Sequence, residues 1–176
     1  MTPTTPAPLR RLAYGVFYSL PGAVRRRLVR LIVGKYIVGA VALVRDSEAP
    51  SPGRILLLRQ PPGVGWSLPA GLLQRREAPA DGCARELYEE TGLRLTAEEL
   101  TPANPSAVIH HRGQWVDVVF EAAVPASTAT LRVDGAEVFE ARFHKIDNLP
   151  PLTGPTARLL SYYGIGPLVD YPEVRS

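Results

Sequence analysis

The strongest constraint on this chain is a run of carboxylates in the segment Gly71–Leu93, which reads GLLQRREAPADGCARELYEETGL. Residues 80–91 of this segment form the clearest helical pattern in the sequence. Glu86, Glu89 and Glu90 stand at positions i, i+3 and i+4 of that helix. They share one face, where like charges repel by roughly 0.2–0.5 kcal/mol per pair. Mg²⁺ and Mn²⁺ prefer carboxylate and water oxygens and would relieve this repulsion, so the pattern predicts a divalent-metal site.

The residues around these glutamates suit a short helix with a loop held against it. Pro79 is favoured in a first helical turn, and Gly92 can end the helix in a left-handed conformation. Arg85 lies beside the carboxylates and can form an ion pair with Glu77. Gly71 has no side chain, so its backbone carbonyl could approach a cation closely. We therefore expect a loop–helix–loop unit that positions oxygen ligands.

Nine positions of this segment follow a fixed spacing: Gly71-x5-Glu77-x7-Arg85-Glu86-Leu87-x-Glu89-Glu90-x-Gly92-Leu93. This spacing resembles the complete signature of the Nudix hydrolase family. The resemblance extends upstream to residues 55–59 and to Trp66-x-Leu68-Pro69, and downstream to residues 140–143 and to Leu149-Pro150. It therefore covers residues 36–163.

The resemblance implies an α/β (α+β) fold, a Nudix-type α/β/α sandwich with a mixed sheet. It also implies that water attacks phosphorus in a diphosphate, with Mg²⁺ or Mn²⁺ as cofactor. By this resemblance the metal ligands are Glu86, Glu89, Glu90 and the Gly71 carbonyl. Together with the paired Arg85 and Glu77, the glutamates form the catalytic set. The general base is one of these glutamates or an acid outside the signature.

Two positions depart from the family pattern. Arg76 stands where many members have glycine, and Ala78 stands where many have a Ser or Thr helix cap. Loss of such a cap costs about 1 kcal/mol, which Pro79 partly recovers by fixing the first turn. Neither position supplies a metal ligand, so the expected chemistry is unaffected.

Several residues outside the signature are candidates for substrate contact or proton transfer. We predict that Arg59, Trp66 and Glu140 bind substrate, although a tryptophan at position 66 more often simply packs beside the signature loop. Further candidates, each with an ordinary strand-surface alternative, are His110, His111, Glu121 and Glu137. Cys83 fits a small buried helix residue better than a reactive thiol.

The substrate is less constrained than the reaction. The stretch Leu68–Leu72 resembles members that act on ADP-ribose and nucleotide sugars, which favours a nucleoside diphosphate derivative. The proline that often marks ADP-ribose specificity is absent, because Val108 and Ile109 occupy its positions. Hydrolysis of (deoxy)nucleoside triphosphates or of capped RNA remains an alternative. A non-catalytic nucleotide-binding module is a further alternative, against which the intact carboxylates argue.

The remaining sequence alternates between strand-like and helical patterns. We predict strands at Tyr36–Val44, Arg54–Arg59, Ser106–His111, Trp115–Val124, Thr130–Val133 and Val138–His144, and a last helix over Pro155–Tyr163. The second strand is a candidate hairpin partner of the first. Strand groups on both sides of a mid-chain helix indicate a mixed α/β or α+β sandwich.

Charge is distributed unevenly along the chain. Residues 1–45 hold eight basic residues and no acid, whereas the remainder holds 12 basic and 17 acidic residues. We divide the chain into a basic N-terminal extension, residues 1–35, and a Nudix hydrolase domain, residues 36–176. Two short amphipathic helices are predicted in the extension, over Leu9–Leu20 and Gly22–Val33.

The basic extension allows three interpretations. The favoured one is a helix that packs its apolar side on the body of the protein or on a second subunit, as in a homodimer. The other two are contacts with anionic lipid or with RNA through Arg25, Arg26, Arg27 and Arg30. A convincing membrane span or signal peptide is not found in the sequence, so a cytoplasmic location is expected.

Overall fold

The computed structural model describes residues 7–110 and 114–171, and two compact units are distinguished, Met1–Tyr36 and Ile37–Ser176. The elements in chain order are α1 (Ala7–Ser19), α2 (Gly22–Ile32), β1 (Ile37–Asp46), β2 (Arg54–Arg59), β3 (Trp66–Ser67), β4 (Ala70–Leu72), α3 (Pro79–Thr91), η1 (Ala97–Glu99), β5 (Thr101–Ile109), β6 (Trp115–Val124), β7 (Glu140–Lys145), η2 (Ile146–Asn148) and α4 (Gly154–Ser161). η1 and η2 are single 3₁₀ turns.

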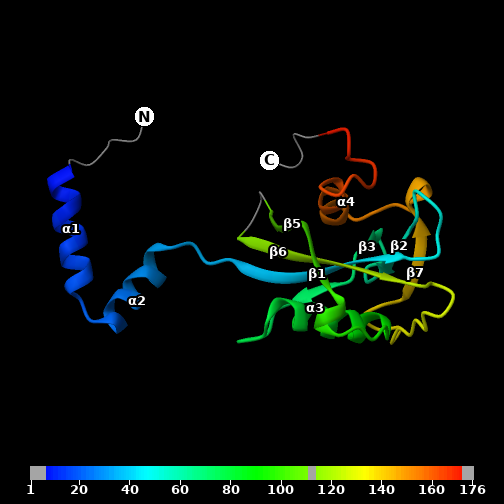
Figure 1. Cartoon of the computed structure of the whole chain (residues 1–176), viewed down its shortest axis with the longest axis horizontal. Helices are drawn as coiled ribbons and strands as arrows, with labels where there is room; N and C mark the ends of the chain where they lie inside the picture. Colours follow the sequence, from blue (N-terminus) through cyan, green and yellow to red (C-terminus); the bar gives the residue numbers. More distant parts are fainter. Residues whose placement is uncertain (1–6, 111–113, 172–176) are drawn as a thin grey trace. The chain divides into compact units, whose positions relative to one another are not determined.

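The second unit is built on a mixed sheet in which β1 is the central strand (Figure 1). β1 pairs with β6 in parallel along its whole length, from Ile37 opposite Trp115 to Asp46 opposite Val124. Along its other edge, β1 pairs antiparallel with β4 and, at its end, with β2. β7 and β3 extend the sheet beyond β2, and β5 extends it beyond β6. The predicted mixed sheet and the antiparallel pairing of the first two strands are confirmed.

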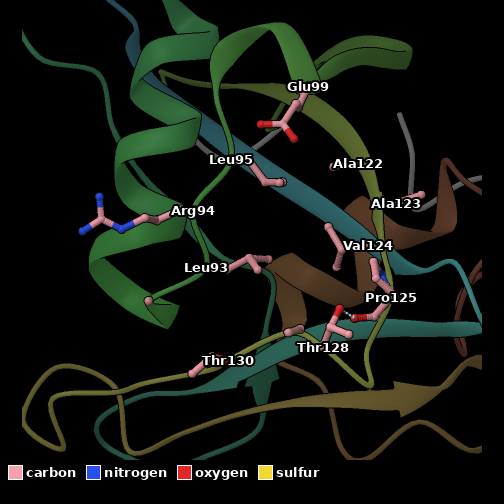
Figure 2. A pocket seen from close by; sticks show the side chains of 12 residues that line it. Leu93, Arg94, Leu95, Glu99, Ala122, Ala123, Val124, Pro125, Thr128 and Thr130 are labelled. Carbon is pink, nitrogen blue, oxygen red and sulfur yellow. Dashed lines mark hydrogen bonds between the residues drawn. The ribbon is translucent and has the colours of Figure 1, made fainter.

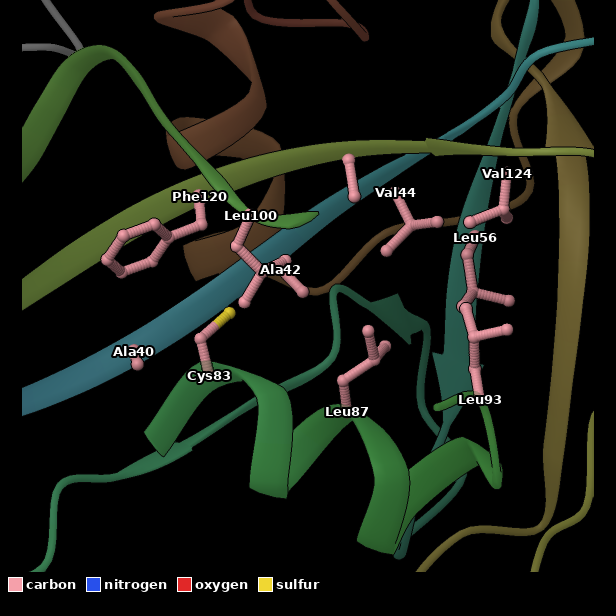
Figure 3. Packing of buried hydrophobic residues seen from close by; sticks show 11 residues of the cluster. Ala40, Ala42, Val44, Leu56, Cys83, Leu87, Leu93, Leu100, Phe120 and Val124 are labelled. Carbon is pink, nitrogen blue, oxygen red and sulfur yellow. The ribbon is translucent and has the colours of Figure 1, made fainter. Parts of the chain in front are cut away.

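One face of the sheet packs against α3 (Figure 3). Successive side chains of a strand point to opposite faces, so Ala40, Ala42 and Val44 of β1 lie together on the α3 side. Cys83 and Leu87 project from α3 into this cluster, and both are almost completely buried. Burying a leucine contributes about 2 kcal/mol, so these contacts fix which face of α3 remains outside.

The opposite face of the sheet packs against α4 (Figure 1). Val41 and Leu43, the alternate residues of β1, contact this second cluster together with Leu159 and Leu160 of α4. Helices therefore cover both faces of one mixed sheet, which confirms the predicted α/β/α sandwich. The arrangement leaves one face of α3 and one end of the central strands available to form a site.

Three element predictions differ from the structure. Residues Thr130–Val133 do not form a strand, because the N–H of Arg132 donates to the carbonyl oxygen of Thr91 at 2.7 Å, at the end of α3. β5 begins five residues earlier than predicted, at Thr101. It contains two prolines, which its position at the end of the strand order tolerates. The short strands β3 and β4 lie in a stretch for which no strand was predicted.

The first unit consists of α1 and α2, as the sequence predicts. None of the described side chains of these two helices is buried. The guanidinium of Arg25 on α2 lies 5.6 Å from the ring centroid of Tyr18 on α1. Helices of the described chain are all too short or too polar to cross a bilayer.

Candidate active site

α3 presents its carboxylates because of how the helix is anchored. Pro79 occupies its first turn. The N-cap residue is Ala78, and no side-chain hydrogen bond caps this end of the helix. Gly92 ends the helix with φ 72°, and its N–H donates to the Tyr88 carbonyl oxygen at 2.8 Å. Leu87 is fully buried on the opposite side of the helix. Both ends of the helix and its buried face are thus as predicted.

Arg85 connects the loop before α3 to two of the glutamates. Its Nε and Nη2 donate to Oε1 and Oε2 of Glu77 at 2.8 and 3.0 Å. Its Nη1 donates to Glu86 at 2.8 Å and to Glu89 at 2.9 Å. The Arg85 hydrogen bonds, with a further one from the Gln74 N–H, lower the pKa of Glu77 to about 2. The positive charge of Arg85 therefore offsets much of the like-charge repulsion between these acids.

Two glycines allow the loop and helix to approach each other closely. Gly71 pairs with Ala40 of β1, and a Cβ at Gly71 would overlap the carboxylate of Glu86. A Cβ at Gly82 would lie 2.9 Å from Oε2 of Glu77. Glycine is therefore required at position 71 to bring the β4 backbone against the carboxylate face of α3, as expected for a backbone ligand next to side-chain ligands.

Glu90 is held from the side opposite Arg85. Its Oε1 accepts a hydrogen bond from Gln60 Nε2 at 2.7 Å, and its Oε2 accepts one from the Ala70 N–H at 2.9 Å. Burial raises the pKa of Glu90 to about 7, against these hydrogen bonds and with support from the charges of Glu86 and Glu137. The sequence did not predict this contact of Gln60, because an amide side chain in a loop rich in proline and glycine does not indicate any particular partner.

The donor set at this site is suited to a hard divalent cation. Glu86, Glu89 and Glu90 supply carboxylate oxygens beside the backbone of Gly71, and Mg²⁺ and Mn²⁺ favour such oxygens. Each carboxylate is engaged by a protein donor, and within the described residues no three acidic, histidine or cysteine side chains form a ready-made metal cluster. A bound cation would compete directly with Arg85 for Glu86 and Glu89.

A pocket of about 510 Å³ lies on the α4 side of the sheet and is lined by Thr156, Arg158 and Leu159 of α4 among others. Gln60 and Ala70 line this pocket and also donate to Glu90, so they connect the pocket to that carboxylate. Arg158 of α4 lines it too, and its buried Nε has no hydrogen-bond partner in the described structure. The pocket thus combines an apolar wall with the cationic side chain of Arg158.

Asp117 of β6 is the pocket residue that sequence reasoning missed. It is buried, and its two oxygens lie 2.7 Å from His110 Nε2 and Trp115 Nε1. The indole N–H of Trp115 donates to one oxygen, and the imidazole of His110 is hydrogen-bonded to the other. Gly39 lies opposite it in β1, where a Cβ would lie 3.2 Å from Asp117 and 3.3 Å from the Gly71 carbonyl oxygen. Asp117 and Glu121 are the two acids of a mostly apolar strand, and that pattern was the available signal.

The other predicted substrate residues are distributed around the sheet. Arg59 and Glu140 form a cross-strand pair, with 3.5 Å between Nη2 and Oε2. Trp66 packs edge-on against His144, 4.3 Å between ring centroids, and does not line the pocket. Glu121 instead pairs with Arg45 at 3.5 Å. His111 lies outside the described residues.

A second pocket, of about 650 Å³, lies at the C-terminal end of α3 (Figure 2). Leu93, Leu95 and Val124 contribute apolar side chains, and Arg94 and Glu99 are its charged residues. None of the signature glutamates lines it. The 510 Å³ pocket, two of whose lining residues donate hydrogen bonds to Glu90, is therefore the better candidate for chemistry on a phosphate ester or anhydride.

Comparison with known proteins agrees with this architecture. The sequence matches the family model of the NUDIX domain over residues 35–162. A MutT-like protein of Streptomyces ambofaciens is 47% identical over 49 residues, which are 28% of this chain and 32% of that protein. An RNA pyrophosphohydrolase of Zymomonas mobilis is 37% identical over 62 residues, 35% of either chain. The matched regions span about a third of the length of these relatives.

Among solved structures, the MutT NUDIX hydrolase of Burkholderia pseudomallei is similar, with a TM-score of 0.55 and 28% identity. The similarity covers 70% of this chain and 94% of that protein. The family model alone spans well over half of the sequence, including all of the carboxylate segment and the pocket. The chain belongs to the NUDIX domain family.

Proposed function

We propose that this chain is a metal-dependent hydrolase that cleaves a diphosphate linkage in a nucleoside diphosphate derivative. The observation that carries the proposal is that two residues, Gln60 and Ala70, connect Glu90 to the neighbouring pocket. Gln60 and Ala70 contact the carboxylate on one side and line a pocket of about 510 Å³ on the other. A substrate whose organic part fills this pocket would bring its diphosphate to the glutamates of α3.

The expected division of roles follows from these contacts. Glu86, Glu89, Glu90 and the Gly71 carbonyl would hold Mg²⁺ or Mn²⁺. The cation supplies charge neutralisation at the phosphates and a more acidic bound water. Arg85 keeps the loop of Glu77 against α3 and orients Glu86 and Glu89. Such positioning is the main requirement of phosphoryl-transfer chemistry.

Substrate preference depends on what the pocket can accept. Trp115 offers an aromatic surface whose indole N–H is fixed by Asp117. Arg158 offers a positive charge, and its buried Nε has no hydrogen-bond partner among the described residues. An aromatic surface and a cation suit a base or sugar joined to a further phosphate. Together with the stretch Leu68–Leu72, this favours ADP-ribose or a nucleotide sugar.

A substrate panel tests the proposal directly. Purified protein would be assayed for phosphate or nucleotide release with Mg²⁺ or Mn²⁺, and with a chelator as control. The panel contains ADP-ribose, nucleotide sugars, (deoxy)nucleoside triphosphates, dinucleoside polyphosphates and 5′-triphosphate or capped RNA. We expect chelator-sensitive turnover of ADP-ribose or a nucleotide sugar. Preferred turnover of a triphosphate or RNA would instead support the alternative that the similarity to an RNA pyrophosphohydrolase suggests.

A matched pair of double variants tests the role of the carboxylates. Replacing both Glu89 and Glu90 with glutamine should abolish turnover and leave the melting temperature close to that of the parent. The control, Asp147→Asn with Asp170→Asn, removes the same two charges at exposed residues outside α3. Unchanged activity in Glu89→Gln/Glu90→Gln would refute the proposal. Substrate binding without turnover in the parent protein would favour a non-catalytic nucleotide-binding module.

A further inference from the structure

The two N-terminal helices expose a large amount of apolar surface. Side-chain exposure reaches 66% at Leu12, 78% at Leu31 and 81% at Ile32. Neither α1 nor α2 contains a buried described side chain. Soluble proteins rarely leave contiguous apolar surface open to water unless it binds something. Such surface is typical of a docking site.

The apolar and basic residues of α2 lie on different faces. Val24, Leu28, Leu31 and Ile32 follow the spacing i, i+4, i+7 and i+8, which forms one stripe of a helix. Arginines fill most of the remaining surface, at positions 25, 26, 27 and 30. On α1, Leu9, Leu12 and Val16 form a corresponding stripe. Helices of this kind lie in the plane of a membrane interface, where arginine side chains extend towards the headgroups.

The charge of this region decides between possible partners. Residues 1–45 contain eight basic residues and no acid. A second copy of the same surface would bring like charges together, which disfavours self-association. RNA would bind the arginines but would leave the apolar stripes in water. An anionic lipid surface matches both properties at once, with about 1 kcal/mol of attraction for each basic residue near the surface.

A small pocket in this unit supports the same partner. It has a volume of about 360 Å³ and is lined by Phe17, Gly22, Arg25, Arg26, Val29 and Arg30. Three arginines and the apolar side chains of Phe17 and Val29 therefore line one space. The Nε of Arg25 is buried and has no hydrogen-bond acceptor among the described residues. A phosphodiester headgroup supplies that acceptor, and the attached chains match the apolar wall.

We propose that the α1–α2 unit docks the protein on the surface of an anionic phospholipid bilayer. The apolar stripes enter the interface, and the arginines bind headgroup phosphates. This inference is independent of the proposed hydrolase activity.

The test uses the full-length chain and vesicle co-sedimentation. We expect binding to phosphatidylcholine vesicles that contain phosphatidylglycerol, weakening as salt increases, and little binding to phosphatidylcholine alone. The variant Arg26→Glu/Arg30→Glu should lower the partition coefficient by about tenfold or more. The matched control, Arg75→Glu/Lys145→Glu, makes the same charge change on exposed residues of the second unit and should change partitioning less than about twofold.

A second variant separates a lipid surface from the other partners. Leu31→Ser/Ile32→Ser leaves the charge unchanged and should also lower partitioning by about tenfold. Both residues are exposed, so the melting temperature of each variant should stay at that of the parent. Binding that is indifferent to lipid charge, or unaffected by Leu31→Ser/Ile32→Ser, would overturn the proposal. So would a lipid-independent dimer, measured by sedimentation velocity, that Leu31→Ser/Ile32→Ser dissociates.

Discussion

Arg85 and Glu77 form a two-point ion pair that joins the loop before α3 to the helix itself, with contacts of 2.8 and 3.0 Å. The two planar groups match in shape, which gives such pairs geometric as well as electrostatic specificity. The third nitrogen of the guanidinium, Nη1, remains free to contact Glu86 and Glu89. One side chain therefore sets the position of the loop and of two acids.

The first prediction concerns the shape of this guanidinium. Arg85→Lys keeps the charge but cannot contact Glu77 at two points while also reaching the two acids. We expect kcat/KM to fall by about tenfold to a hundredfold, since small displacements of catalytic groups are costly, and the melting temperature to fall as well. Arg94→Lys, which alters a guanidinium over the Tyr88 ring instead, is the control. Wild-type kinetics in Arg85→Lys would contradict this prediction, because they would show that a positive charge at position 85 is sufficient for activity.

The second prediction concerns the approach of β4 to α3. A Cβ at Gly71 would overlap the Glu86 carboxylate, so Gly71→Ala must displace either that side chain or the strand. We expect turnover to fall by about tenfold or more and the Mg²⁺ concentration for half-maximal activity to rise. Gly15→Ala, at a helical position with no atom within 4 Å of the new methyl group, should change neither. Metal titrations of both variants provide the measurement.

Local signals explain why much of the fold was predictable. The helix was placed to within one residue because Pro79, the apolar spacing and Gly92 all act within the segment itself. The strands β2 and β6 were placed without error, since mostly apolar segments are bounded there by turn or loop residues. The ion pair between Arg85 and Glu77 followed from the family spacing. In each case the determining interactions are close in sequence.

Contacts between distant segments account for what could not be predicted. Asp117 is hydrogen-bonded to His110, which follows β5, and to Trp115 of its own strand. It also lies opposite Gly39 in the parallel pairing of β1 and β6. The amide of Gln60 reaches Glu90 across 30 residues of sequence. Residues 130–133 have strand-like composition, yet the N–H of Arg132 donates to the Thr91 carbonyl oxygen at the end of α3. Propensity does not determine such pairings, because the partner is supplied by the tertiary fold.

The third prediction concerns backbone strain in the signature loop. Arg76 has φ 69°, the only positive value at a non-glycine residue in the described chain. An L-residue pays about 1–2 kcal/mol for this conformation, whereas glycine does not. Arg76→Gly should therefore raise the free energy of unfolding by about 0.5–1 kcal/mol, after the added entropy of the unfolded chain is subtracted. Arg75→Gly should lower it; equal effects of the two variants in urea denaturation would contradict the explanation.

The fourth prediction is a pH dependence of stability at the end of β1. Asp46 is buried and accepts hydrogen bonds from the N–H groups of Glu48 and Ala126 and from Arg54, the last at 2.7 Å. Burial alone would raise the pKa of Asp46, but these hydrogen bonds together hold it below the ordinary value of 3.8. The carboxylate therefore stabilises the fold fully above about pH 4, and this contribution is lost as the pH falls through the folded-state pKa.

Asp46→Asn tests this assignment because the amide has the same shape but cannot accept all three hydrogen bonds. At pH 7 we expect the free energy of unfolding to fall by about 2 kcal/mol. The difference between variant and parent should shrink below about pH 4, where the parent carboxylate becomes protonated. Asp147→Asn, at an exposed acid, should show no such dependence. Urea denaturation of all three proteins between pH 3 and 7 gives the comparison, and a constant difference across that range would mean that packing, rather than charge, makes Asp46 necessary.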